Sequence, residues 1–75
     1  MTNKQKVAEA IEKLPKTMNA LVVGVYKAGL PADEVAASLS LTMDDARKLL
    51  GQAIRKVSDD VGLTEERVEE LFCFL

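Results

Sequence analysis

The segment LTMDDARKLL (41–50), together with the basic pair that follows it, contains the side chains best suited to bind another molecule. The segment holds two aspartates and then Arg47-Lys48, and the second basic pair, Arg55-Lys56, comes eight residues after the first. Arginine and lysine hold DNA phosphates and pair with guanine in the major groove, and an aspartate can accept a hydrogen bond from cytosine. The chemistry predicted here is therefore non-covalent binding to double-stranded DNA.

Within this set we expect Arg47 and Lys48 to contact DNA directly and Arg55 and Lys56 to hold phosphates. No aromatic residue lies between these basic positions, which disfavours stacking on single-stranded nucleic acid or RNA. The full predicted DNA-binding set is Thr42, Met43, Asp44, Arg47, Lys48, Arg55 and Lys56.

The two aspartates have a second interpretation, which is that they stabilise the start of a helix. Thr42 is a good N-cap, because its hydroxyl can accept from the N–H of Asp44 or Asp45, and carboxylates in a first helical turn are stabilised by the helix dipole. For Asp45 we expect this structural role. For Asp44 both roles stay open, because one acid is compatible with reading a cytosine whereas two acids beside phosphates are unfavourable.

Catalytic and metal-binding patterns are missing from the sequence. There is no histidine and a single cysteine, Cys73, so neither a zinc site nor a nucleophile with its base can be assembled. The acidic stretch 59–70 has the length of a calcium loop, but Val61 and Leu63 stand where ligands are needed and Thr64 where a glycine is needed. We therefore expect no enzyme, no metal and no cofactor.

Charge is unevenly distributed along the 75 residues, although the net charge is only −2. Residues 1–57 contain nine basic and six acidic residues, a net charge of +3, whereas residues 58–75 contain one basic and six acidic residues, a net charge of −5. Local charge acts over a Debye length of about 8 Å, so a weakly basic body can still present a positive face. For the scattered lysines (Lys4, Lys6, Lys13, Lys16 and Lys27) we expect only a solvated exterior.

The composition predicts a single small domain in the cytoplasm. Hydrophobic residues make up 48% and charged residues 29% of the chain, and no apolar run is long enough to span a membrane. The N-terminal residues mix charges with apolar side chains and lack the apolar core and cleavage site of a signal peptide. One cysteine agrees with a reducing compartment.

Apolar spacing predicts an all-α fold of about five helices. Helices are expected over 3–13, from Pro15 to Gly29, from Pro31 through Ser38, over 43–57 after a tight turn, and over 64–74 with Thr64 as the N-cap. The expected inward positions are Val7, Ala10, Ile11, Leu14, Met18, Leu21, Val22, Val25, Val35, Ala36, Leu39, Ala46, Leu49 or Leu50, Ala53 and Val57.

The last predicted helix gathers large apolar residues, including both phenylalanines of the chain. One interpretation is that it folds back to complete a core that so short a chain needs. The other is that it forms an interface, either in a homodimer or with a larger protein. The candidate interface residues are Val68, Leu71, Phe72, Phe74 and Leu75.

Turn and apolar residues in the first two thirds of the chain recur at a familiar spacing. Leu14-Pro15 precedes the long second helix, and Gly29-Leu30 begins fifteen residues after Leu14. Further matching features are Glu34-Val35-Ala36, Leu39, Leu41 and the pair Arg55-Lys56. In this pattern residues 10–57 resemble region 4 of the sigma-70 family of bacterial transcription initiation factors.

The resemblance implies four helices, of which the last two, in residues 31–57, form a helix-turn-helix. Family members use that unit to bind promoter DNA and other surfaces of the same domain to bind RNA polymerase. The chain departs from the pattern at Ser40, where a glycine is usual, at Asp44 and Asp45, and at Leu49, which replaces a frequent arginine. The scaffold therefore matches better than the residues that would read DNA.

Two functions stay open at this point. The first is a DNA-binding transcription regulator that uses the helix-turn-helix. The second is a protein-interaction adaptor with the same fold, which engages RNA polymerase or another regulator through acidic and apolar surfaces. The two differ in one measurable respect, because binding to duplex DNA weakens as salt concentration rises.

Overall fold

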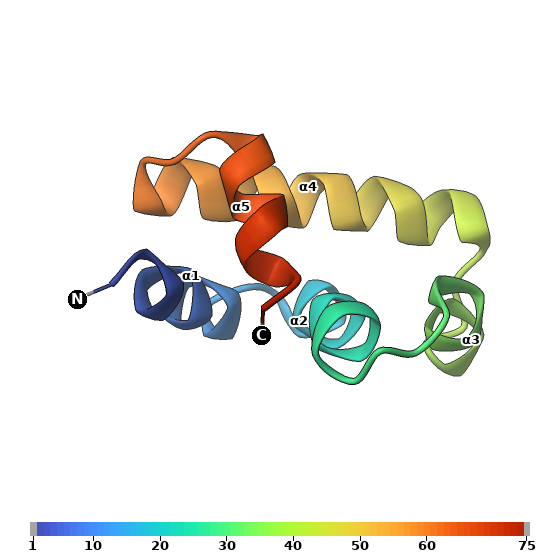
Figure 1. Ribbon diagram of the computed structural model, residues 1–75. Coiled ribbons are helices and arrows are strands. Elements are labelled where there is room, and N and C mark those ends of the chain that lie inside the picture. The colour runs from blue at the N-terminus through green and yellow to red at the C-terminus, as the bar shows by residue number, and fades with distance from the viewer. Residues whose placement is uncertain (1, 75) are drawn as a thin grey trace.

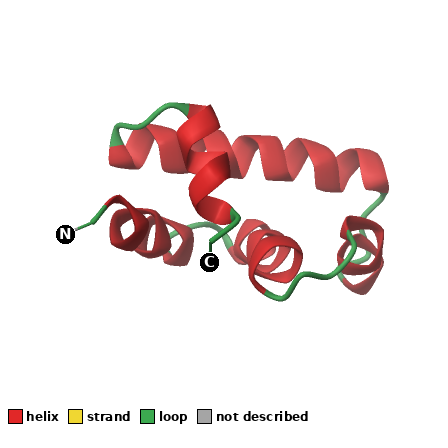
Figure 2. Ribbon diagram, viewed as in Figure 1, coloured by secondary structure: helices red, strands yellow, loops and turns green. Residues whose placement is uncertain are grey.

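The structure, a computed structural model, describes residues 2–74, and within them it contains helices and no strand (Figures 1 and 2). This confirms the all-α prediction. None of these helices has both the length and the apolar character needed to cross a membrane. In chain order the elements are α1 (Asn3–Glu12), α2 (Lys16–Val22), the π-helical segment η1 (Val23–Lys27), α3 (Ala32–Ser38), α4 (Met43–Val61) and α5 (Glu65–Phe72).

The longest helix, α4, forms one side of the molecule along its whole length (Figure 1). α1, α2 and α3 follow one another along the other side, and α5 crosses from the end of α4 toward the space between α1 and α2 (Figure 1). The described part measures 35 × 20 × 20 Å. α4 thus has one face covered by other helices and one face in solvent.

Threonine hydroxyls cap three of the helices. Thr2, Thr42 and Thr64 accept hydrogen bonds from the backbone N–H groups three residues later, at 3.2, 3.1 and 3.2 Å. The Thr42 and Thr64 caps were predicted from the sequence. The Thr2 cap was not, and there the Gln5 side chain also accepts from the Thr2 N–H at 3.1 Å, which completes a capping box.

The end of α4 lies four residues beyond the predicted position. The sequence suggested an end at Val57, but the helix continues through Val61, and the chain first leaves it at Gly62, whose φ is +72°. Glycine adopts this left-handed conformation without a steric penalty. The extra turn carries Asp59 and Asp60 on the helix, and Val61 packs against the core.

The second predicted helix is present, but its last part is π-helical. Gly24 lies at the start of this segment, and a Cβ atom placed on it would lie 3.0 Å from two side-chain carbons of Val35 in α3. The glycine therefore allows the η1 backbone to approach α3 closely, and a larger side chain would push the two apart. Gly29, with φ +70°, ends the segment as predicted.

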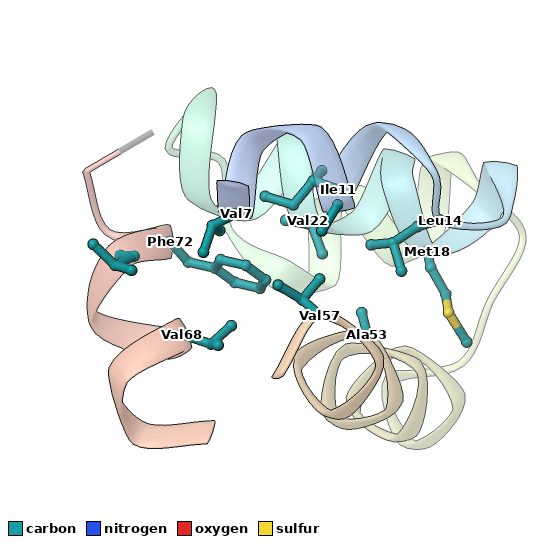
Figure 3. Packing of buried hydrophobic residues seen from close by; sticks show 11 residues of the cluster. Val7, Ile11, Leu14, Met18, Val22, Ala53, Val57, Val68 and Phe72 are labelled. Carbon is teal, nitrogen blue, oxygen red and sulfur yellow. The ribbon is translucent and has the colours of Figure 1, made fainter. Parts of the chain in front are cut away.

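Two groups of buried side chains hold the helices together. The larger group joins α1, α2, α4 and α5, and Figure 3 shows Phe72 projecting from α5 toward Val57, with Val7 close by. The smaller group fixes α3 against the first half of α4 and consists of Leu21, Val35, Ala36 and Ala46. Leu49 and Leu50, both half-buried, pack against both groups, so the prediction that one of them faces inward holds for each in part.

The C-terminal helix α5 belongs to the core of its own chain. Val68 and Phe72 are fully buried, Leu71 is nearly so, and the Phe72 ring meets the edge of Tyr26 with centroids 5.2 Å apart. These three apolar residues are therefore not available for an interface. Phe74 is 66% exposed, so its interface role stays a prediction, and Leu75 lies outside the described residues.

Candidate nucleic-acid interface

A four-residue turn, 39–42, joins α3 to α4 and fixes the angle between them. The N–H of Leu41 donates to the carbonyl of Ala36 at 2.8 Å, and that of Ser40 donates to Ala37 at 3.1 Å. These two bonds and the left-handed conformation of Ser40 form a Schellman motif. Ser40 has φ +59°, so the serine occupies a position where a glycine would be unstrained. This is the position at which the chain departs from the glycine of the sigma region 4 pattern.

All seven predicted DNA-binding side chains lie on the exposed part of this unit. Residues 42–44, 47–48 and 55–56 are exposed, and Met43 is 40% accessible. Within residues 2–74 the one ion pair joins Arg67 and Glu70 at 2.9 Å. The basic side chains of α4 are therefore free to bind an anion.

Two of the basic residues share the outermost row of α4. Lys48 and Arg55 are seven residues apart, about two helical turns, and so lie on the same side of the helix. That side is opposite Ala46 and Ala53, which are buried against the other helices. Asp44 stands one turn before Lys48 on this row, and Asp59 stands one turn after Arg55. The outer row thus carries two cations between two carboxylates.

The other two basic residues lie on opposite flanks of α4. Arg47 and Lys56 are nine residues apart, about two and a half turns, so their side chains leave the helix in opposite directions. Lys56 lies beside α1, where it lines a depression with Ala10 and Lys13. Helical periodicity alone could have revealed this division, and it also places Gln52, which is exposed, next to the outer row.

The two aspartates at the start of α4 do not complete a capping box with Thr42. The Thr42 hydroxyl accepts from the backbone N–H of Asp45, but neither aspartate side chain has a hydrogen bond or ion pair among the described residues. Their carboxylates therefore act on the helix only through its dipole. Asp33 and Glu34 occupy the first turn of α3 in the same way. Four carboxylates thus stand at the beginnings of the two helices.

Outside this unit, Tyr26 is a partly buried polar group. Burial, with the nearby Glu69 and Cys73 as smaller causes, raises the pKa of Tyr26, so this phenol stays neutral at physiological pH. No group of three or more Cys, Asp or Glu side chains in residues 2–74 is placed to hold a metal ion.

Comparison with protein-family models, with curated proteins and with solved structures gives no match for this chain. The resemblance to sigma region 4 therefore stays a prediction, and the residues themselves have to support any function.

Proposed function

We propose that the chain is a non-catalytic, DNA-binding transcription regulator that places the outer face of α4 in the major groove. The observation that carries the proposal is the pair Lys48 and Arg55, which are exposed, unpaired within the described residues and in line along a helix held firmly by the core. A helix with its side chains is about 10–12 Å wide, and the major groove is about 12 Å wide. The short turn and the two helices it joins agree with a helix-turn-helix of the sigma region 4 type.

Six of the seven predicted residues have roles that follow from their places on this face or beside it. Lys48 can donate to guanine, Asp44 can accept from cytosine, and Met43 offers an apolar contact to a thymine methyl group. The Thr42 hydroxyl accepts from Asp45 and keeps its own hydrogen for a phosphate. Arg47 and Arg55 reach phosphates at the flank and farther along the helix.

The charge on α3 and α4 indicates that binding is weak. Over residues 31–57 four acidic residues balance four basic residues, and the carboxylates at the helix starts oppose every nearby phosphate. Affinity therefore depends on the few cations of α4. A regulator of this kind needs either a preferred sequence or a protein partner to act at a chosen site.

The double variant Arg47→Ala, Lys48→Ala tests the proposal through fluorescence anisotropy with a labelled duplex at low salt. We expect it to abolish detectable binding, because two phosphate or base contacts disappear. The matched control is Lys4→Ala, Lys27→Ala, which removes the same charge from exposed positions outside α4 and is expected to bind nearly as well as the unaltered chain. Equal affinity of the two double variants would contradict the proposal.

The second candidate is a protein-interaction adaptor that binds RNA polymerase or another regulator. It is favoured by the four carboxylates in the first turns of α3 and α4, which have no ion pair within residues 2–74, and by the exposed Met43 beside Asp44. Purified RNA polymerase and the chain can be combined in gel filtration. An adaptor predicts co-elution that Asp44→Lys abolishes while Arg47→Ala, Lys48→Ala preserves it, and the DNA-binding proposal predicts no such selectivity.

A further inference from the structure

We propose that the groove between α1 and the second half of α4 is an additional phosphate-binding surface, which holds one strand of the DNA backbone beside α4. The inference rests on the proposed function, because it assigns a ligand to a flank of the same helix. It assigns a role to lysines that the sequence alone suggested were only a solvated exterior.

The groove consists of two adjoining depressions of about 220 and 240 Å³. Lys13 and Asp60 line both of them, so the depressions are neighbours. α1 packs against this half of α4 through Val7 and Val57 (Figures 1 and 3). The walls are therefore held by the main core.

Three lysines surround the groove. Lys6 and Lys13 are two turns apart on one side of α1, and Lys56 faces them from α4. The groove also contains the carboxylates of Glu9 and Asp60. None of these groups forms an ion pair within residues 2–74, and three ammonium groups against two carboxylates leave the groove a net charge of +1.

The position of the groove relative to α4 points to a phosphodiester backbone as the ligand. A helix that fills the major groove lies between the two phosphate strands, so cations on both of its flanks can reach them. Arg47 lies on one flank. Lys56 lies on the other, and Lys13 extends that flank onto α1. One duplex can therefore contact the outer row and both flanks of α4 at the same time.

The shape of the groove fits the same ligand. One of its two depressions is lined by the apolar residues Ala10, Leu14 and Pro15 as well as by Lys13 and Lys56. A deoxyribose can lie against the apolar residues while its phosphates meet the lysines. A small anion would use only the lysines, and an extended strand uses both parts.

The test is the salt dependence of duplex binding by the full chain with Lys13→Gln and Lys56→Gln together. Each lost phosphate contact lowers the slope of log affinity against log salt by about 0.9, so we expect a slope smaller by about 1.8. The matched control is Lys4→Gln, Lys27→Gln, because Lys27 lines a different depression with Ala8 and Ile11, and Lys4 lies one turn before Ala8. The control should keep the slope of the unaltered chain.

Several outcomes would overturn the inference, and they differ from failure of the proposed function. If the groove variant keeps the full slope, or if the groove variant and the control lose it equally, no phosphate lies in the groove. The proposed function then still stands if Arg47→Ala, Lys48→Ala abolishes binding. If the unaltered chain does not bind duplex at low salt, both the function and the inference fail. If polyglutamate binds through Lys13 and Lys56 more tightly than duplex at the same salt, the groove accepts an acidic peptide instead.

Discussion

At the scale of single residues, the neighbouring acids Asp44 and Asp45 have different surroundings. Asp44 lies on the outer row with Lys48, whereas Asp45 is rotated by about 100° from Asp44 and supplies its backbone N–H to the Thr42 cap. One charge therefore faces the proposed DNA, and the other mainly serves the start of the helix. The first residue affects binding and the second affects folding.

Asp44→Asn is expected to strengthen binding to duplexes of random sequence, because it removes a charge that opposes nearby phosphates. Asp45→Asn, the control with the same charge change, should mainly lower the free energy of unfolding, by up to about 1 kcal/mol through the helix dipole. Anisotropy titrations and urea unfolding measure the two effects. If Asp44→Asn weakens binding to one sequence and leaves the others unchanged, Asp44 reads a base and the chain is a specific DNA-binding protein.

At the scale of elements, the turn between α3 and α4 contains the one non-glycine residue with positive φ in residues 2–74, Ser40. A left-handed backbone places the Cβ atom of an L-residue too close to the next carbonyl oxygen. The strain is offset by the Schellman hydrogen bonds and by the packing of α3 on Leu21 and Ala46. The turn therefore keeps its geometry without the usual glycine.

Ser40→Gly should raise the free energy of unfolding by about 0.5 to 1 kcal/mol, because relief of the strain exceeds the added entropy of the unfolded chain. Chemical denaturation measures this change. The midpoints of the variants are compared, with the same dependence of the unfolding free energy on denaturant concentration. Ser40→Ala is the control and should bring no gain, since alanine keeps the Cβ atom. A glycine variant no more stable than the alanine variant would mean that the turn is unstrained.

Local sequence signals predicted these elements only where their causes are local. The Thr42 and Thr64 caps and the end of the second helix at Gly29 follow from residue type and spacing, so they could be predicted. The π-helical segment could not, because it depends on the close approach of Gly24 to Val35, which are brought together by packing. The end of α4 was predicted four residues too early, at Val57, whereas the helix continues to the left-handed Gly62.

At the scale of the whole molecule, stability depends on one core shared by α1, α2, α4 and α5. Phe72 is the largest fully buried side chain, and it contacts Tyr26 on the far side of the core. A chain of this length has little apolar surface in reserve. Removing this ring therefore affects every helix that surrounds it.

Phe72→Ala should lower the free energy of unfolding by about 3 to 5 kcal/mol, which unfolds much of so small a domain. Phe74→Ala is the matched control and should have little effect, because Phe74 is 66% exposed. Thermal melting with gel filtration measures stability and apparent mass together. A folded Phe72→Ala variant whose only change is a lower apparent mass would show that α5 is an interface between copies.

The candidate site could be predicted from the sequence only in part. The predicted residues of α4 are exposed as a DNA contact requires, because local helical spacing determines which of them face away from the core. The division of Arg47 and Lys56 between two flanks also follows from that spacing. The proximity of Lys13 and Lys56 could not be predicted from that spacing. The two lysines are far apart in the chain and are brought together only by the packing of α1 on α4.

The most direct test of the central claim is the affinity of the unaltered chain for a duplex over a series of salt concentrations. If α4 and its flanks bind DNA, log affinity falls linearly with log salt, and the slope divided by about 0.9 gives the number of phosphates neutralised. The four residues assigned to phosphates, Arg47, Arg55, Lys56 and Lys13, together predict a slope of about −3.6. A flat response, or no binding at low salt, would contradict the DNA-binding account and favour the adaptor.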